Sequence, residues 1–484
     1  MKNSIFRGFV FVILVIALAG LAGCGGGNDD PDCDSDDPCV TRTPRVTPPP
    51  THTPAPTNTP TPTPTPTSVG PTATATLAPE ACLPSSSLGI LVQSTNATAY
   101  VPKGNWGGGP VGVFVVPVET SAGLGKGGAA TTITTPNTVN SCSCNSATGV
   151  TVCVANNPDT YLISGTTLNK TLTSGATGTA HFSGGSCMNC GVVVDSTTNT
   201  AVIAMGLSGG VGSGYQALNL ATNTFAAPIP SGTGVSEDIA VDPVRNLILS
   251  PNESLTAGTA VGTYELVRTK PSTAVFENQI APIPTPTPIG APPVTTFLDS
   301  AGEDCTTGIA LSTDEGTGNL FIADLTQAKF TPGTPTGTWS APSQFQNFPE
   351  FKLFAAGTSG IAVAPGTHFA VVTGEFGGAL EGVIQLPSTS GTGIPKVVDW
   401  VSFMMPSDPS GAGWAQGFDP HTVTAYVSPN APHKAFGVLG NGSFTFLAVV
   451  DLDGLLKAKR IAGKHMVDPT LDLVKLGLVT FIAE

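Results

Sequence analysis

Carboxylates placed just before apolar runs are the residues of this sequence best suited to chemistry. Glu237 and Asp238 precede one such run, Glu303 and Asp304 precede another, and His421 precedes a third. If each run begins a strand at the same face of a sheet assembly, these side chains converge. Carboxylate oxygens are the ligands that Ca²⁺ prefers, and a bound cation polarises a carbonyl or activates water. These five residues therefore form a predicted site for a ligand or for Ca²⁺.

The same acids also fit a second interpretation, as turn-forming or solvated residues. Asp419 aligns with Asp195 and Asp242 at the turn that follows an apolar run, where an Asp side chain hydrogen-bonds the turn backbone. The sequence contains no His-Glu-x-x-His pair, no Gly-x-Ser-x-Gly nucleophile motif and no phosphate-binding Gly-rich motif. We therefore predict no catalytic residue from the sequence, and both interpretations of the acids stay open.

Ten cysteines give a second possible constellation. Disulfides form in exported proteins, and the candidates are those that lie close together in sequence: Cys33, Cys39, Cys142, Cys144, Cys153, Cys187 and Cys190. Bridges within or between neighbouring repeats are the simplest expectation, with a separate bridge between Cys33 and Cys39. A zinc site made from Cys142, Cys144, Cys187 and Cys190 is the alternative. If Cys24 is lipidated, nine cysteines remain and at least one stays unpaired or bonds to another chain.

Most of these residues lie within or beside a repeat of strand, polar turn and second strand. Seven copies begin at Gly89, Cys142, Gly191, Glu237, Gly308, Gly360 and Gly417. Their turns recur every 47 to 55 residues, apart from one interval of 70 residues that contains the Pro-rich run Ala281–Pro293. Repeats of about 40 to 50 residues with three or four strands are propeller blades. We therefore predict an all-β fold, a seven-bladed β-propeller over residues 82–484, with Leu478–Ala483 joining the first blade. A chain of β-sandwich domains is the alternative, but such domains span about 100 residues each.

The repeat resembles that of the YVTN and NHL groups of β-propellers. The resemblance covers about residues 86–455 and consists of a hydrophobic strand, an Asp-Pro or Asp-Ser turn, an Asn and a second strand, as in Glu237–Pro251. It implies that these two strands form the inner half of each blade. Propeller lactonases hold a divalent cation at the channel mouth with carboxylates and Asn, which is what the resemblance implies for the acids above. Because the shared motif is mostly hydrophobic pattern, it indicates a fold more than a function.

The N-terminal residues have the composition of an export signal followed by a stalk. Lys2 and Arg7 precede the apolar run Phe9–Leu18 and then Leu21–Cys24, which is the order of a secretory signal. Leu-Ala-Gly-Cys resembles the bacterial lipobox, which implies removal of residues 1–23 and lipidation of Cys24. Gly25 after that cysteine is associated with the outer membrane. A membrane-spanning helix is the alternative, but the run is shorter than the roughly 20 residues that a span needs.

Residues 24–81 follow as an acidic segment and then a Pro/Thr-rich linker. Proline fixes φ and removes hydrogen-bond donors, so we expect an extended polyproline II stalk rather than a packed domain.

The charge balance narrows the choice of partners. The formal net charge is −14, and an acidic surface argues against nucleic acid as a partner. We expect an envelope lipoprotein, lipid-anchored at the outer membrane or cell surface, whose propeller binds a protein, a glycan or a small ligand. The alternative is a metal-dependent hydrolase of the lactonase type with its site at the channel mouth.

Overall fold

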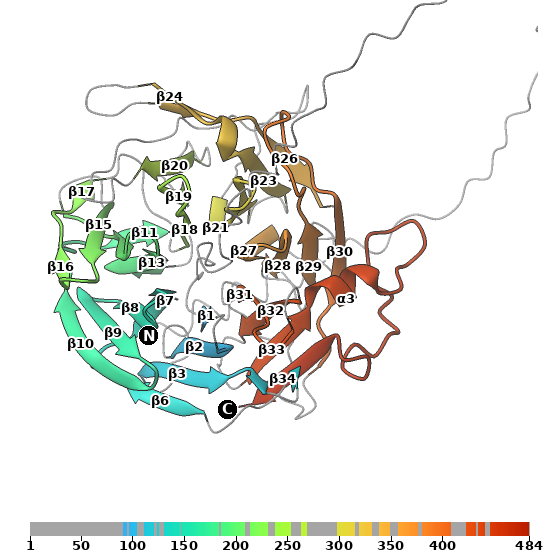
Figure 1. Ribbon diagram of the computed structural model, residues 1–484, viewed down its shortest axis with the longest axis horizontal. Coiled ribbons are helices and arrows are strands. Elements are labelled where there is room, and N and C mark those ends of the chain that lie inside the picture. The colour runs from blue at the N-terminus through green and yellow to red at the C-terminus, as the bar shows by residue number, and fades with distance from the viewer. Residues whose placement is uncertain are drawn as a thin grey trace, which may run out of the picture. The chain divides into compact units, whose positions relative to one another are not determined.

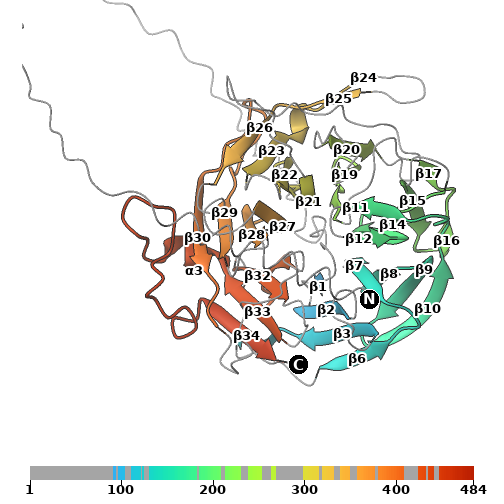
Figure 2. The same cartoon turned by 180° about the vertical axis from the view of Figure 1, so that it is seen from behind.

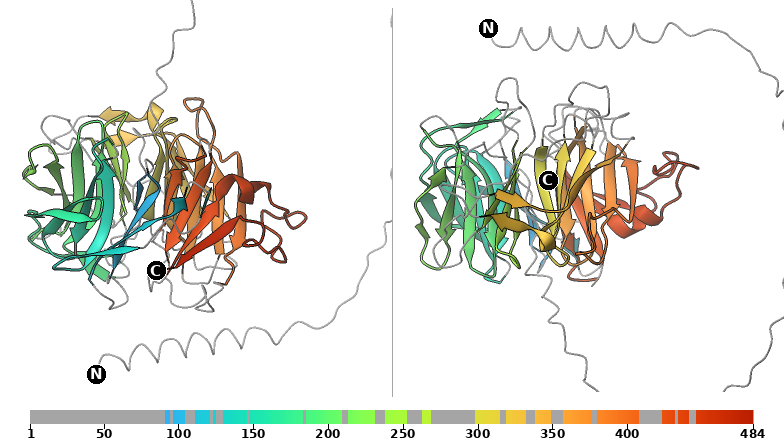
Figure 3. Two further views of the ribbon diagram at one scale, coloured as in Figure 1. Left: turned by 60° about the horizontal axis from the view of Figure 1, so that its bottom comes forward. Right: turned by 90° about the horizontal axis from the view of Figure 1, so that it is seen from above.

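A computed structural model of the chain describes residues 91–93, 96–103, 111–120, 123–124, 130–145, 147–182, 185–208, 213–230, 238–252, 263–268, 298–314, 319–331, 338–348, 357–375, 380–407, 423–431, 434–440 and 446–483. All of them belong to the second of two compact units, Ala73–Glu484. This unit is an all-β propeller, in which antiparallel sheets stand around a central axis (Figure 1). Figure 2 shows the same ring from behind, and Figure 3 shows the sheets from the side. No helix in the described ranges is long and apolar enough to cross a membrane.

The first three sheets each contain at least four strands. From the centre of the ring outward, their strands are β1 (Leu91–Gln93), β2 (Thr98–Lys103), β3 (Gly112–Pro117) and β6 (Thr131–Thr134) in the first sheet, β7 (Val139–Asn145), β8 (Val150–Ala155), β9 (Asp159–Ser164) and β10 (Thr167–Thr173) in the second, and β13 (Asn189–Asp195), β14 (Thr200–Met205), β15 (Gly214–Asn219) and the short β16 (Thr224–Phe225) and β17 (Ile229–Pro230) in the third.

The fourth sheet shows three strands, and the fifth, sixth and seventh show four each. Their strands, in the same order, are β18 (Ala240–Asp242), β19 (Leu247–Asn252) and β20 (Thr263–Arg268), then β21 (Leu298–Asp304), β22 (Ile309–Asp314), β23 (Asn319–Asp324) and β26 (Ser343–Asn347), then β27 (Gly357–Ala364), β28 (Phe369–Glu375), β29 (Leu380–Gln385) and β30 (Asp399–Met404), and finally β31 (Val423–Val427), β32 (Ala435–Gly440), β33 (Phe446–Asp451) and β34 (Val479–Ala483).

Smaller elements decorate this ring. Three two-stranded hairpins are β4 (Glu119–Thr120) with β5 (Gly123–Leu124), β11 (Ala180–Phe182) with β12 (Gly185–Cys187), and β24 (Lys329–Thr331) with β25 (Thr338–Ser340). A 3₁₀ turn, η2 (Leu325–Gln327), follows β23, and the helix α3 (Leu452–Lys457) follows β33. The chain after α3 runs back to the sixth sheet, where Met466 forms a parallel bridge with Ser402 of β30.

The inner hairpins form because the sequence alternates buried apolar runs with residues suited to tight turns. Asn199 and Asn246 adopt positive φ values of 54° and 55° in the turns after β13 and β18, a conformation that Asn tolerates better than most residues. Apolar side chains of each sheet pack against the next sheet. Ile309 and Leu311 of β22, for example, share a cluster with Ile361 and other residues of the sixth sheet. Inner strands are therefore buried on both faces, and β13 is buried along its whole length.

The innermost strands all run in the same direction, so the propeller has two different faces. Residues at strand starts contact each other across sheets, as Asn140 Nδ2 does with the carbonyl of Asn189. Residues in the turns after these strands also contact each other, as Asn145 Nδ2 does with Asn199 Oδ1. We call the face where innermost strands begin the start face, and the face where they end the turn face.

Two of the seven predicted repeats are out of register with the sheets. The copy beginning at Gly308 covers β22 and β23, the second and third strands of its sheet, and the innermost strand is β21. That strand reads LDSAGED and has too few large apolar residues to signal burial, although it is almost wholly buried between neighbouring sheets. The last copy places its turn at Asp419, which lies outside the described residues. In the structure the turn of that sheet follows β31, and Ser428 Oγ accepts hydrogen bonds from its backbone.

The ring closes without the strand exchange expected from the sequence. The C-terminal strand β34 pairs with β33 of its own sheet, and it lies beside the first sheet in Figures 1 and 2. The seam between the last and first sheets contains an apolar cluster that includes Val116 and Tyr426. It also contains the buried carboxylate of Glu119, which accepts hydrogen bonds from Tyr426 Oη at 2.8 Å, Ser428 Oγ at 2.7 Å and Asn430 Nδ2 at 2.9 Å. Side-chain contacts therefore close the described part of the ring.

Candidate functional site

The predicted site residues that the structure describes lie at opposite faces of the propeller. Asp238 lies two residues before β18, at the start face, and its side chain is buried. Glu303 and Asp304 are the last two residues of β21, at the turn face. Glu237 and His421 lie outside the described residues. The structure does not bring Asp238 together with Glu303 and Asp304, because the apolar run after Asp304 is the second strand of its sheet rather than the first.

Asp304 instead takes the turn position that Asp195 and Asp242 take in other sheets. Asp304 Oδ1 accepts two hydrogen bonds from Thr306, one from the backbone N at 3.1 Å and one from Oγ1 at 2.5 Å. Asp195 Oδ1 accepts the equivalent pair from Thr197, and Asp242 Oδ1 accepts from two backbone N–H groups of its turn. The interpretation of Asp195 and Asp242 as turn-forming residues is confirmed, and Asp304 joins them.

Three carboxyl groups meet on the turn face, those of Asp242, Glu303 and Asp304, which we call the carboxyl cluster. Arg245 Nη1 donates to Asp242 Oδ2 at 2.7 Å and to the carbonyl oxygen of Cys305 at 3.2 Å. This arginine therefore links the fourth sheet to the fifth and sets a positive charge beside the cluster.

The position of Arg245 depends on a glycine in the neighbouring turn. Gly308 has a φ of 74°, a conformation that glycine adopts without steric cost. A Cβ at this position would lie 2.5 Å from the guanidinium carbon of Arg245. Gly308 therefore serves both the turn and the approach of Arg245.

Glu303 is the member of the carboxyl cluster whose chemistry is most perturbed. Burial raises the pKa of Glu303 well above its ordinary value of 4.5, and the charge of Asp242 raises it further, while Arg245 opposes this. Both carboxyl oxygens of Glu303 are buried and have no hydrogen-bond partner of good geometry. Glu303 therefore keeps its proton to a higher pH than an exposed glutamate does, which avoids two adjacent buried charges.

Asp304 and His368 form an ion pair between the fifth and sixth sheets. His368 Nδ1 lies 2.5 Å from Asp304 Oδ2, and the histidine side chain is 26% exposed. Burial raises the pKa of Asp304, but hydrogen bonds from His368 and from Thr306 outweigh burial and leave it lowered. The hydrogen bond to Asp304 in turn raises the pKa of His368. The pair favours an imidazolium facing a carboxylate.

An Asp–His pair can orient a general base, and here the pair also joins the fifth sheet to the sixth. Cys305, next to Asp304 in sequence, is disulfide-bonded and so supplies no thiolate. Within the described part of the chain, no three His, Cys, Asp or Glu side chains are arranged to hold a metal ion. The chemistry visible here is proton binding and sheet-to-sheet linkage.

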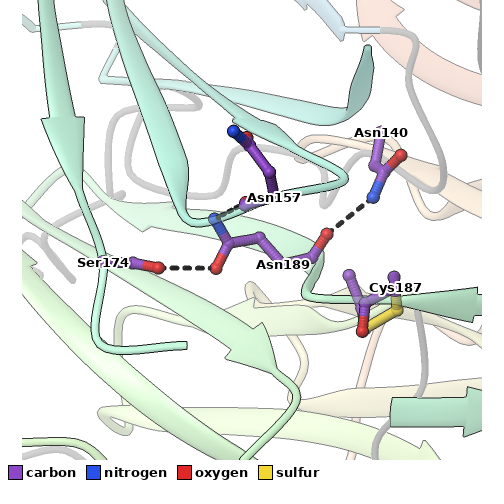
Figure 4. The surroundings of a disulfide bond; sticks show 6 residues. Asn140, Asn157, Ser174, Cys187 and Asn189 are labelled. Atoms are coloured by element: carbon purple, nitrogen blue, oxygen red, sulfur yellow. Dashed lines mark hydrogen bonds between the residues drawn. A yellow bond between two sulfur atoms is a disulfide. The ribbon is translucent and has the colours of Figure 1, made fainter. Parts of the chain in front are cut away.

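The start face carries a second polar network, centred on Asn189. Its Oδ1 accepts from Ser174 Oγ at 2.8 Å, and its Nδ2 donates to the carbonyl of Asn157 at 2.8 Å. Its own carbonyl accepts from Asn140 Nδ2 at 2.7 Å. Figure 4 shows these contacts beside the disulfide of Cys187. Asn189 therefore ties the second sheet to the third at a point that the disulfide fixes.

The disulfide prediction is confirmed for four of the candidate cysteines. Cys142 bonds to Cys153 across β7 and β8, and Cys187 bonds to Cys190. Cys144 is a buried free thiol, so the prediction that it forms a disulfide was wrong. The alternative of a zinc site fails because Cys142, Cys187 and Cys190 are already in disulfides. Burial raises the pKa of Cys144 to about 12. Cys24, Cys33 and Cys39 lie outside the described residues.

Sequence reasoning missed Arg245, His368, Glu119 and Cys305. The positions of Arg245 and His368 carried a usable signal, because each stands in the turn of a recognised repeat. Glu119 carried none, since its three partners lie more than 300 residues away. Cys305 was left out because it has no near neighbour among the cysteines.

No family model matches this chain, and no curated protein matches it. Solved structures do resemble it. Hydrazine synthase from Kuenenia stuttgartiensis aligns with a TM-score of 0.48 and 10% identity over 75% of this chain and 95% of that one. The β-propeller domain of Cps50 (Swd1) from Myceliophteria thermophila aligns with a TM-score of 0.45 and 10% identity over 74% and 94%. AztD from Citrobacter koseri aligns with a TM-score of 0.42 and 12% identity over 76% and 83%. The sheets themselves establish the fold of this chain as a β-propeller.

Proposed function

We propose that the chain is an envelope lipoprotein that holds a β-propeller at the outer membrane or cell surface, where the propeller binds a protein, glycan or small ligand. The basic, apolar and small-residue order of the first 24 residues supports export and lipidation at Cys24. The Pro/Thr-rich linker before the propeller supports a stalk that separates the binding module from the membrane.

The observation that carries the export part of this proposal is the pair of disulfides inside the propeller. Cys142–Cys153 lies in the second sheet, Cys187–Cys190 joins the β11–β12 hairpin to β13 of the third, and all four cysteines are buried. Disulfides persist in oxidising compartments and are rare in reducing ones. The pairing therefore agrees with an exported protein, as the N-terminal sequence predicts.

Binding is favoured over hydrolysis by the contacts of the polar residues. The side chains of Asp195, Asp242 and Asp304 accept hydrogen bonds from the backbone of their turns. Asp238 lies at the face opposite Asp304. A lactonase-type site, with Ca²⁺ held by Glu237, Asp238, Glu303, Asp304 and His421, remains the alternative proposal. Such a site needs acidic side chains that converge at one end of the channel. Asp238 does not converge with Glu303 and Asp304.

Detergent phase partition of the full chain, with and without Cys24→Ala, tests the anchoring. The wild-type chain should enter the detergent phase and carry the mass of acyl chains, and the variant should stay in the aqueous phase. Partition of both chains into the aqueous phase would contradict a lipid anchor. For the hydrolase alternative, the wild-type chain and Glu303→Gln would be compared on a lactone panel with added Ca²⁺. Turnover that the substitution abolishes would favour that alternative over binding.

We further infer that the three-stranded sheet β18–β19–β20 is a complete blade, which makes seven. It follows β17 and precedes β21 in chain order, and Arg245 attaches it to the fifth sheet as other turn residues attach their neighbours. Averaged electron-microscope images of the particle viewed down its axis would show seven radial densities, and six would contradict the inference.

A further inference from the structure

Cys305 begins the innermost turn of the fifth sheet, next to the carboxyl cluster. It is 2% exposed and disulfide-bonded. The other described cysteines cannot be its partner, because four bond to one another and Cys144 is free. The partner is therefore one of the four cysteines that precede the first described strand: Cys24, Cys33, Cys39 and Cys82.

We propose that Cys305 is bonded to Cys82, so that a disulfide fastens the end of the N-terminal linker to the innermost turn of the fifth sheet. Cys82 belongs to the same compact unit as Cys305, Ala73–Glu484, whereas Cys24, Cys33 and Cys39 belong to the other. Cys24 is also the predicted lipidation site. Cys33 and Cys39 stand close enough in sequence to bond to each other.

The reach of the chain permits this pairing. Leu91 lies two residues before Gln93, the last residue of β1, and therefore close to the turn face, where Cys305 also lies. Two residues of strand cover about 7 Å, at roughly 3.3 Å per residue. Nine peptide steps separate Cys82 from Leu91, and an extended chain covers about 30 Å in that number. The chain therefore needs no passage from one face of the propeller to the other to bring Cys82 to Cys305.

The chemistry of the bond needs an oxidant. Two thiols lose two protons and two electrons to the disulfide of an oxidising protein in the export compartment, which is reduced to a dithiol. The proposal thus rests on the export part of the proposed function, but it needs neither the lipid nor the ligand.

Peptide mapping without reduction tests the pairing directly, because trypsin separates the relevant cysteines. Cys82 is the sole cysteine of residues 46–103, and Cys305 is the sole cysteine of residues 269–329, whereas Cys24, Cys33 and Cys39 share a peptide that ends at Arg42. The full chain, purified from the envelope and alkylated before digestion, should yield peptide 46–103 linked to peptide 269–329. The linked mass should disappear after reduction.

A thiol count on denatured protein gives a second readout. Cys82→Ser should expose one more thiol per chain than wild type, and the double variant Cys82→Ser/Cys305→Ser should return the count to that of wild type. The control Cys144→Ser should lower it by one. Cys305 linked to the peptide ending at Arg42, or Cys82 alkylated without reduction while Cys142–Cys153 is intact, would overturn the pairing. Absence of every disulfide would overturn both the pairing and the proposed export.

Discussion

Glu119 joins the two ends of the ring, and its replacement should destabilise the whole propeller. Glu119 is 7% exposed, and its carboxylate accepts three hydrogen bonds from the seventh sheet. Glu119→Ala leaves the buried hydroxyls of Tyr426 and Ser428 and the part-buried side-chain amide of Asn430 without an acceptor. Each unsatisfied buried donor costs about 1–3 kcal/mol. Water entering beside Asn430 reduces the sum, so we expect a loss of about 3–5 kcal/mol in the free energy of unfolding, as for other broken buried networks.

Urea denaturation followed by intrinsic fluorescence measures this loss, with the slope of the transition checked for a change in mechanism. Tyr426→Phe removes one donor and leaves the carboxylate with two partners, so it should cost about 1 kcal/mol. The double variant Glu119→Gln/Tyr426→Phe should be less destabilised than the sum of the single changes, with a coupling of at least about 0.5 kcal/mol. Asp453→Ala is a matched control, because Asp453 makes an exposed pair with Lys457 and should lose less than about 0.5 kcal/mol.

The reasoning about ring closure would be refuted by a specific outcome. If Glu119→Ala unfolds at the same urea concentration as the wild type, the apolar cluster of the seam closes the ring unaided. Limited proteolysis offers an independent check, since a weakened seam should expose the first and last sheets to cleavage before the others.

Three further predictions concern protons, thiols and the start face. The folded-state pKa values of Glu303 and His368 are both raised. The protonated form of each group therefore contributes to the free energy of unfolding, fully below about pH 4.5 for Glu303 and below about pH 6.5 for His368. This contribution is lost as the pH rises through each folded-state pKa. Urea unfolding from pH 4.5 to 8.5 should show falling stability, with a smaller fall in Glu303→Gln, and a flat profile in the wild type would contradict the shifts. Burial raises the pKa of Cys144 to about 12, so this thiol should resist iodoacetamide at pH 8 in the folded protein and react once the protein is denatured. Rapid labelling of the folded protein would instead place the thiol at the surface. Asn189→Ala breaks the links to Ser174, Asn157 and Asp159 and should lower the free energy of unfolding by about 2–4 kcal/mol. A change below about 0.5 kcal/mol would show that apolar packing between the second and third sheets holds this junction unaided.

Much of the fold follows from local pattern. The stretch Glu237–Pro251 contains an apolar run, an Asp-Pro turn and a second apolar run, and each part acts through its immediate neighbours. The described structure has β18, a turn with Asn246 at positive φ, and β19 at that place. Repetition of such a hairpin at blade spacing was enough to predict a propeller, because no hairpin buries its apolar side chains alone.

Which strand lies innermost was decided by packing between sheets. The strand β21 holds Asp299, Glu303 and Asp304 among small residues, yet all but one of its residues are buried. Its burial comes from the sheets on either side, which a window of sequence does not contain. The sequence pattern indicated β22 as the innermost strand instead of β21. It therefore placed Glu303 and Asp304 at the start face and predicted a site at the channel mouth.

Most of the strands, the tight turns, the blade spacing and four of the bonded cysteines could be predicted from the sequence, because these depend on residues that are near one another in the chain. Three contacts arise only in the folded propeller: Asp304 with His368, Arg245 with the turn of Cys305, and Glu119 with Tyr426. These contacts join residues 60 to 307 positions apart. Polar groups at such separations meet only after the sheets have packed, since it is the packing that removes their water and makes the new partners necessary.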